Sequence, residues 1–354
     1  MKKILLVLVG GTICTELNDK GNLSVSCRAG SLITDNFFRS GSPYIDSVSI
    51  ETTENLGILS ENMTTDRWNI IIETFKKYNN KYDGIIMAHG TDTLAYSAAL
   101  FSMLLSGTHI PVFVVSAHKP LMSEHTNGND NFRCAVECIC RGITPNIYVP
   151  YRNPSDGQMY LHLASRLRQC ENYSDDFHSA GELNISGMTE ENYGIYFNKI
   201  KAMFPSDKVK KVIDTANPIQ LKNNVLYLMP YVGIDYSAYN YDGFSAVLHG
   251  SYHAGTACVE AEKDYSQNSI LHMLDRCLSC GTDVYFSPSV LKQGTYETVS
   301  VIGNHTVNGK KINFIYGYTN EMAYAKLVIA YSLFDDDEKR KEFINNEYNF
   351  EFII

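Results

Sequence analysis

The sequence lacks several features that define large classes of proteins. It has no apolar stretch near the ~20 residues of a membrane-spanning helix, and its apolar run at residues 4–9 is too short for the core of a signal peptide. It has no excess of basic residues either, because 30 Lys and Arg stand against 39 Asp and Glu. A net charge of −9 disfavours a nucleic-acid or anionic-membrane surface. We therefore expect a cytoplasmic protein with neither nucleic acid nor membrane as a partner.

The motifs of phosphate and metal sites are also missing. Neither G-x-x-x-x-G-K-[ST] nor G-x-G-x-x-G occurs, which disfavours a phosphate- or nucleotide-binding α/β protein. The nine cysteines are an odd number in apolar segments, as expected for buried thiols in a reducing compartment. Cys277 and Cys280 have metal-ligand spacing, but no second pair accompanies them at zinc spacing. We expect no metal site.

The chain is long enough for two domains, and apolar runs alternate with helical patterns along it. Strands that are apolar on both faces and alternate with helices indicate a parallel sheet covered on both sides. The predicted fold class is α/β, with a larger N-terminal parallel-sheet domain (residues 1–195), a linker (196–223) and a smaller C-terminal α/β domain (224–354). Predicted elements include strands at residues 4–9, 85–88 and 111–116, helices at 65–78 and 94–105, and an extended segment at 299–301.

Two short motifs follow apolar runs, GGTI at residues 10–13 and HGTDT at residues 89–93. Glycines let backbone and ligand approach closely, and ligands of parallel sheets bind beyond the carboxyl ends of the strands. Thr12 is either a turn or cap residue, or a nucleophile that needs a proton acceptor. Thr91 and Asp92 either cap the following helix, or contact a reacting group and receive a substrate ammonium.

A third segment, at residues 59–63, precedes the helix predicted at 65–78. Ser60 has the chemistry to donate to a substrate carboxylate, and Glu61 to accept from an ammonium. A serine and an asparagine before a helix are equally typical of an N-terminal cap. Both interpretations stay open at this point.

These three segments, in this order, resemble the N-terminal domain of the L-asparaginase family. Residues 112–120, 250–256 and 318–326 resemble further segments of that family, so the likeness spans most of the chain. The resemblance implies a two-domain α/β fold assembled as a homodimer or homotetramer. It also implies hydrolysis of a small amino-acid amide, asparagine to aspartate and ammonia, without a cofactor.

The resemblance also assigns roles to residues of this chain. Thr12 would attack the side-chain amide and form an acyl-enzyme, and Thr91 with Asp92 would form a second catalytic cluster. Ser60 would hold the substrate's α-carboxylate, with Glu61 beside it, and Asp92 would hold the substrate's α-ammonium. Gly11 and Gly90 would complete the substrate-binding loops, with backbone amides near Thr91 at the oxyanion.

Two positions depart from the family pattern. The family has a lysine in the second cluster, where this sequence has Gln169 with Arg168 beside it. Neither acts as a general base, because glutamine does not titrate and arginine stays protonated. The family also has a tyrosine in the loop after Thr12, and residues 14–42 contain none. Two alternatives to an active amidohydrolase therefore remain, a catalytically weakened amino-acid-binding protein and the amidase subunit of a tRNA-dependent amidotransferase.

Overall fold

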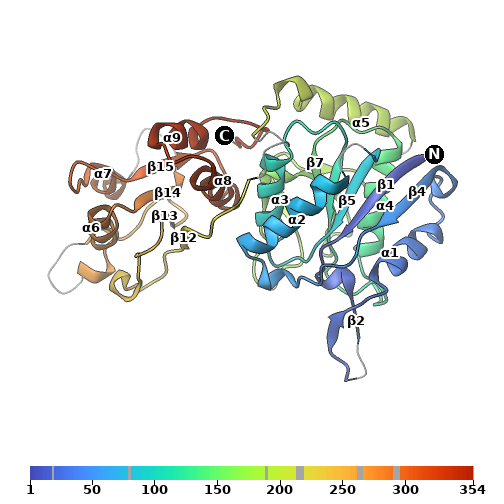
Figure 1. Ribbon diagram of the computed structural model, residues 1–354, viewed down its shortest axis with the longest axis horizontal. Coiled ribbons are helices and arrows are strands. Elements are labelled where there is room, and N and C mark those ends of the chain that lie inside the picture. The colour runs from blue at the N-terminus through green and yellow to red at the C-terminus, as the bar shows by residue number, and fades with distance from the viewer. Residues whose placement is uncertain are drawn as a thin grey trace. The chain divides into compact units, whose positions relative to one another are not determined.

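In the computed structural model the chain forms two compact units (Figure 1). Unit 1 comprises Met1–Ile219 and Tyr348–Phe350, and unit 2 comprises Gln220–Glu347 and Glu351–Ile354. Helix α5 (Glu190–Met203) belongs to unit 1, where Ile200 is buried in the core, so it takes up the first part of the segment predicted as a linker. The structure describes residues 1–17, 20–78, 81–187, 190–212, 219–260, 266–289 and 296–353.

Unit 1 is built on a seven-stranded sheet with the order β11-β8-β7-β6-β5-β1-β4. Strands β4, β1, β5, β6 and β7 are parallel, whereas β8 and β11 join in antiparallel fashion. This confirms the predicted α/β class. The strands are β1 (Lys2–Leu8), β4 (Val48–Thr52), β5 (Gly84–Ala88), β6 (Val112–Val115), β7 (Ile147–Arg152), β8 (Met159–Leu163) and β11 (Leu183–Asn184).

Helices cover both faces of this sheet, which explains why the sequences of its strands are continuous apolar runs. One core packs Ile4 and Leu6 of β1 against α1 (Ala29–Phe38) and α4 (Gly128–Cys140). Figure 1 shows α2 (Thr65–Tyr78) and α3 (Leu94–Leu104) on the other face. Residues Ile4 to Val7 are completely buried, and each such side chain contributes about 1.5–3 kcal/mol to folding.

Unit 2 contains a parallel four-stranded sheet with the order β12-β13-β14-β15. Its core packs α6 and α7 against the sheet through side chains such as Leu274 and Ile302. The elements of unit 2 are β12 (Val225–Leu228), β13 (Ala246–Gly250), α6 (Ile270–Cys280), β14 (Asp283–Ser289), α7 (Glu297–Asn304), β15 (Asn313–Tyr316), α8 (Asn320–Leu333) and α9 (Asp337–Asn345).

One predicted element is wrong. The extended segment expected at residues 299–301 lies inside helix α7. The valines at 299 and 301 are β-branched and favour strands, but helical packing prevails because Ile302 is completely buried in the core of unit 2.

The polar segment after Thr12 has more structure than its sequence indicates. Strands β2 (Thr15–Leu17) and β3 (Leu23–Val25) form an antiparallel hairpin, and α1 begins four residues after it. Ser26 and Arg28 both bind the carboxylate of Glu16 at its base. Residues 18 and 19 lie outside the described part. Of the helices described, none has the length and apolarity needed to cross a lipid bilayer.

Candidate active site

The two glycine-threonine motifs meet at one edge of the unit 1 sheet. Strands β1 and β5 are parallel neighbours, with Leu8 opposite Ala88, so both motifs leave the sheet at its carboxyl edge. The loops touch through their glycines, because a Cβ on Gly11 would lie only 2.1 Å from the Cα of Gly90. Gly11 also has a φ of 74°, which glycine adopts without strain. Glycine at these positions therefore brings the two motifs into backbone contact.

Thr12 begins the short 3₁₀ helix η1 (Thr12–Cys14) directly after this contact. Its carbonyl accepts a hydrogen bond from the hydroxyl of Thr15 at 2.8 Å, which fixes the turn. The side chain of Thr12 is half-buried, and its hydroxyl makes no hydrogen bond to any residue in the described part of the chain. Thr12 is thus a turn residue, as one interpretation predicts, with its hydroxyl left available for a ligand.

Ser60 joins the third predicted segment to the second motif. Its buried hydroxyl accepts a hydrogen bond from the backbone amide of Asp92 at 3.2 Å, and its carbonyl accepts one from the hydroxyl of Thr93 at 2.9 Å. Ser60 does not cap α2, because the side chain of Thr64 takes that place. The cap interpretation of Ser60 is therefore wrong. Glu61, its neighbour in the chain, is exposed.

The second motif places its polar groups at the start of α3. Thr91 is half-buried and Asp92 is exposed. Neither side chain caps the helix, since the cap residue is Thr93 and its side chain makes no capping bond. The interpretation of Thr91 or Asp92 as a helix cap is thus wrong. Both side chains stay available at a helix N-terminus, where negative charge is stabilised.

His89 is completely buried at the end of β5. Burial lowers the pKa of its imidazole to about 4, so the ring is neutral at pH 7. Its Nδ1 lies 2.8 Å from the carbonyl oxygen of Gly90, which can only accept, so Nδ1 carries the proton. His89 therefore orients the Gly90 peptide and does not serve as a base.

Gln169 supplies the helix cap that the motif itself lacks. Its amide nitrogen donates to the carbonyl of Thr91 at 2.8 Å, and its amide oxygen accepts from the backbone amide of Ala95 at 3.2 Å. Gln169, at the position predicted for the second catalytic cluster, thus lies next to Thr91. Its neutral side chain is hydrogen-bonded to two backbone groups. Arg168, beside it, is exposed.

A cavity of about 340 Å³ opens beside Thr91, Asp92 and Gln169. Its remaining lining comes from the end of β7 and from the segment after Gln169. The sequence analysis did not predict this part of the lining. The signal available was β7, which runs parallel to β6 and so ends at the same edge of the sheet. The additional lining residues are Tyr151, Cys170, Glu171, Asn172, Tyr173, Ser174, Asp175 and Phe177.

The arrangement provides two threonine hydroxyls, a serine, a carboxylate and a helix N-terminus at one sheet edge. The family model described as "Asparaginase, N-terminal" matches residues 3–199, more than half of the chain. The chain belongs to the asparaginase family. That match covers every residue that the sequence places in this site.

Curated relatives of this asparaginase-family chain include proteins of two kinds. A glutamyl-tRNA(Gln) amidotransferase subunit of Methanococcus maripaludis is 25% identical over 238 residues, which cover 66% of this chain and 55% of that protein. An L-asparaginase of Thermococcus kodakarensis is 30% identical over 152 residues, 42% of this chain and 44% of that one. The chain thus spans about half the length of these curated relatives.

Solved structures share the fold along nearly all of the chain. The thermostable L-asparaginase from Thermococcus kodakarensis matches with a TM-score of 0.70 and 19% identity, covering 99% of each chain. L-asparaginase I from Vibrio cholerae matches with a TM-score of 0.69 and 19% identity, covering 100% of this chain and 99% of that one. At this identity the likeness establishes the asparaginase fold of both units.

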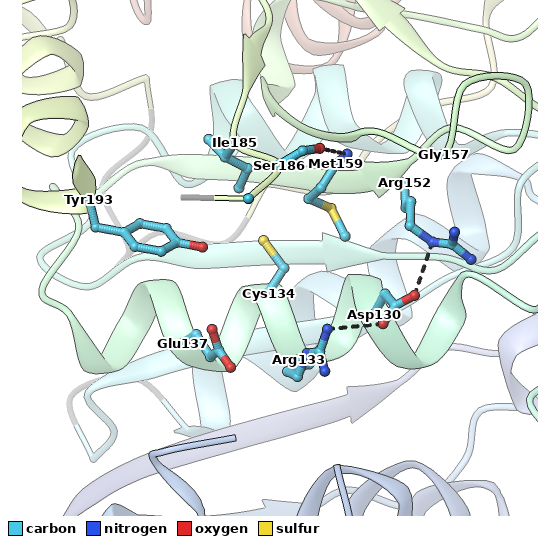
Figure 2. A pocket seen from close by; sticks show the side chains of 11 residues that line it. Asp130, Arg133, Cys134, Glu137, Arg152, Gly157, Met159, Ile185, Ser186 and Tyr193 are labelled. Carbon is cyan, nitrogen blue, oxygen red and sulfur yellow. Dashed lines mark hydrogen bonds and ion pairs between the residues drawn. The ribbon is translucent and has the colours of Figure 1, made fainter. Parts of the chain in front are cut away.

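A second cavity of the asparaginase-family unit, of about 260 Å³, contains none of the predicted site residues (Figure 2). Its charged side chains form ion pairs. Asp130 binds Arg133 at 3.2 Å and Arg152 at 3.0 Å, while Glu137 pairs at 3.0 Å with Arg141, which does not line the cavity. Each of these ions therefore has a partner, and the pair of Asp130 with Arg152 joins α4 to β7.

Proposed function

We propose that this chain is an amidohydrolase that cleaves the side-chain amide of L-asparagine to L-aspartate and ammonia, with Thr12 as the nucleophile. The contact between Gly11 and Gly90 carries this proposal, because it draws the loops of Thr12 and Thr91 to one sheet edge. Membership of the asparaginase family supports the reaction class. In the proposed assembly, a homodimer or homotetramer, a second copy completes the site.

In the proposed reaction, the hydroxyl of Thr12 attacks the amide carbon and forms an ester. The C–N bond breaks, the Thr12 proton passes to the leaving nitrogen, and ammonia departs. Water then hydrolyses the ester and returns the proton to Thr12. Backbone amides at the start of α3 stabilise the oxyanion, and the Gln169 contacts hold that helix end in place.

Ammonia release tests the proposal directly. Purified chain is incubated with asparagine, glutamine and D-asparagine, and ammonia is measured by a coupled assay. We expect release from asparagine in equal amounts with aspartate. Binding of asparagine without ammonia from any of the three would contradict hydrolysis and favour the weakened amino-acid-binding protein, for which neutral Gln169 is the supporting observation.

The curated relatives support a second candidate, an amidase subunit of a tRNA-dependent amidotransferase. In that case the ammonia would be used by a partner protein acting on a charged tRNA. The net charge of −9 opposes direct tRNA binding by this chain. Ammonia release that rises several-fold only when a partner protein and charged tRNA are added would favour this candidate.

The substitution Gly11→Ala should separate the two motifs. The new Cβ would meet the Gly90 backbone at 2.1 Å, and the residue would have to keep a φ of 74°. We expect kcat/KM for asparagine to fall at least about 100-fold, since a shift near 1 Å in a site has this effect. The matched control is Gly41→Ala, which has a φ of 71° but open space around it. Equal losses in the two variants would show that the glycine contact does not assemble the site.

The substitution Gln169→Lys tests the departure from the family pattern. Lysine still donates to the Thr91 carbonyl and adds a titratable amine, but it leaves the amide of Ala95 without its acceptor. We expect turnover of asparagine to rise, or at least to persist. Gln169→Met, which matches the length without hydrogen bonds, should lower turnover. An inactive lysine variant beside a fully active methionine variant would contradict this.

A further inference from the structure

The cavity of Figure 2 contains one positive charge more than its ion pairs balance. The carboxylate of Asp130 lies 3.2 Å from the guanidinium of Arg133 and 3.0 Å from that of Arg152, so two cations share one anion. Neither arginine has another ion pair in the described part of the chain. The other carboxylate of the lining, that of Glu137, is already paired with Arg141. In a chain with a net charge of −9, this local excess of positive charge favours an anionic ligand.

The geometry of Arg152 points independently to an anion. Its Nε atom is buried and makes no hydrogen bond in the described part of the chain, although an oxygen of Asp130 lies within ion-pair distance at 3.0 Å. Buried N–H groups normally have an acceptor, and a guanidinium presents its N–H groups as a fork that matches the two oxygens of a carboxylate. The chain supplies one carboxylate to two such forks. A second carboxylate is therefore the group that this end of the cavity fits best.

The middle of the cavity is apolar and uncharged. Cys134 of α4, Met159 of β8 and the buried side chain of Ile185 line it. Figure 2 shows the sulfur atoms of Cys134 and Met159 facing the cavity from α4 and β8. A hydrogen bond to the Cys138 thiol and burial raise the pKa of Cys134, so its thiol stays neutral at pH 7. A ligand held by the two arginines therefore places an apolar group against these side chains.

The size of the cavity limits the ligand. Its volume of about 260 Å³ is below the usual range of pockets that hold drug-sized molecules. Tyr193 of α5 lies at the end away from Asp130 in Figure 2, and the guanidinium of Arg141 packs over its ring at 4.0 Å. Along α4 the cavity extends from Asp130 to Glu137, a rise of about 10 Å. This length accommodates a carboxylate followed by a short alkyl chain.

We propose that this cavity is a binding site for a small monocarboxylate with an apolar chain, whose carboxylate binds Arg133 and Arg152. The alkyl chain then lies against Cys134 and Met159. With such a ligand two guanidiniums face two carboxylates, which balances the charge of the cavity. A dicarboxylate fits less well, because its second charge would meet the apolar middle of the cavity. No residue assigned to the proposed amide hydrolysis lines this cavity, so the inference does not depend on that reaction.

Calorimetric titration of the full chain with hexanoate, without any amide present, tests this site. We expect saturable binding of hexanoate. Two probes separate the contributions of charge and chain: 1-hexanol has the same chain without the charge, and succinate has two charges without an apolar end. Both should bind at least about tenfold more weakly than hexanoate, because each lacks one half of the complementary chemistry. Absence of saturable hexanoate binding, or binding of 1-hexanol as tight as that of hexanoate, would overturn the proposal.

Two variants of the charged triad should change the affinity in opposite directions. Arg133→Gln leaves Asp130 with Arg152 alone and should weaken hexanoate binding at least about tenfold, whereas Asp130→Asn removes the competing carboxylate and should strengthen it several-fold. The two side chains are 41% and 33% exposed, so the fold is expected to survive, and circular dichroism checks this.

The matched control is Lys208→Gln, which removes an exposed positive charge outside the cavity and should leave the affinity unchanged. Equal effects of the Arg133 and Lys208 variants, or loss of hexanoate binding in a folded Asp130→Asn variant, would each overturn the proposal.

Discussion

The substitution Thr12→Ala should lower the turnover of asparagine by about 10⁴-fold or more, the size of loss seen when a catalytic nucleophile is removed. Asparagine binding should stay detectable, because the other residues proposed to hold it, among them Ser60 and Asp92, are unchanged. Steady-state ammonia release gives the rate, and calorimetry gives the affinity.

The matched control for this experiment is Thr12→Ser. Serine keeps a hydroxyl at the start of η1 and should retain a measurable part of the activity, since only the methyl group is lost. Equal turnover rates of the Thr12→Ala variant and the wild-type protein would show that Thr12 is not the nucleophile. A serine variant as inactive as the alanine variant would show that a hydroxyl at this position is not sufficient and that the site also needs the methyl group.

The substitution Lys326→Met should lower the free energy of unfolding of unit 2 by about 3–5 kcal/mol, the usual cost of removing one partner of a buried ion pair. The Nζ of Lys326 lies 2.8 Å from a carboxylate oxygen of Glu351, and both side chains are completely buried. The same Nζ donates to the hydroxyl of Tyr318 at 2.9 Å. Methionine would leave the Glu351 carboxylate buried without its cation. Urea unfolding measures the change.

Two variants separate the charge effect from simple loss of packing. The double variant Lys326→Met/Glu351→Leu should recover most of the lost stability, because no ion then remains buried. Lys341→Met removes an exposed ion pair with Asp337 at 2.7 Å and should change stability by less than about 1 kcal/mol. A double variant less stable than Lys326→Met alone would contradict this account of the ion pair.

The sequence predicts the sheet of unit 1 well because its strands and helices have strong, continuous patterns. The apolar run after Lys3 has no polar residue, and the helix at residues 65–78 has one clear apolar face, so β1 and α2 lie where predicted. Residues 299–301 show the limit of such patterns. Their valines favour a strand locally, and only the burial of Ile302 in the core explains the helix.

The site could be predicted only in part. The motifs around Thr12 and Thr91 end neighbouring strands, so their common sheet edge follows from the sequence. The hydrogen bonds between Gln169 and residues 91 and 95 join segments more than 70 positions apart, and no sequence periodicity indicates such a contact. The burial of Lys326 could not be predicted from the sequence either, because its ion-pair partner Glu351 lies 25 positions further along the chain. The roles of Thr12, Thr91 and Asp92 in catalysis stay predictions.

The most direct test of the central claim is a search for an acyl group on Thr12. The full chain is mixed with asparagine, quenched in acid within milliseconds, digested and mapped by mass spectrometry. We expect a β-aspartyl ester on the peptide that contains Thr12, present in the wild type and absent in Thr12→Ala. Ammonia release with the acyl group on another residue, such as Thr91, or an unchanged acyl signal in Thr12→Ala would contradict the role of Thr12 as the nucleophile.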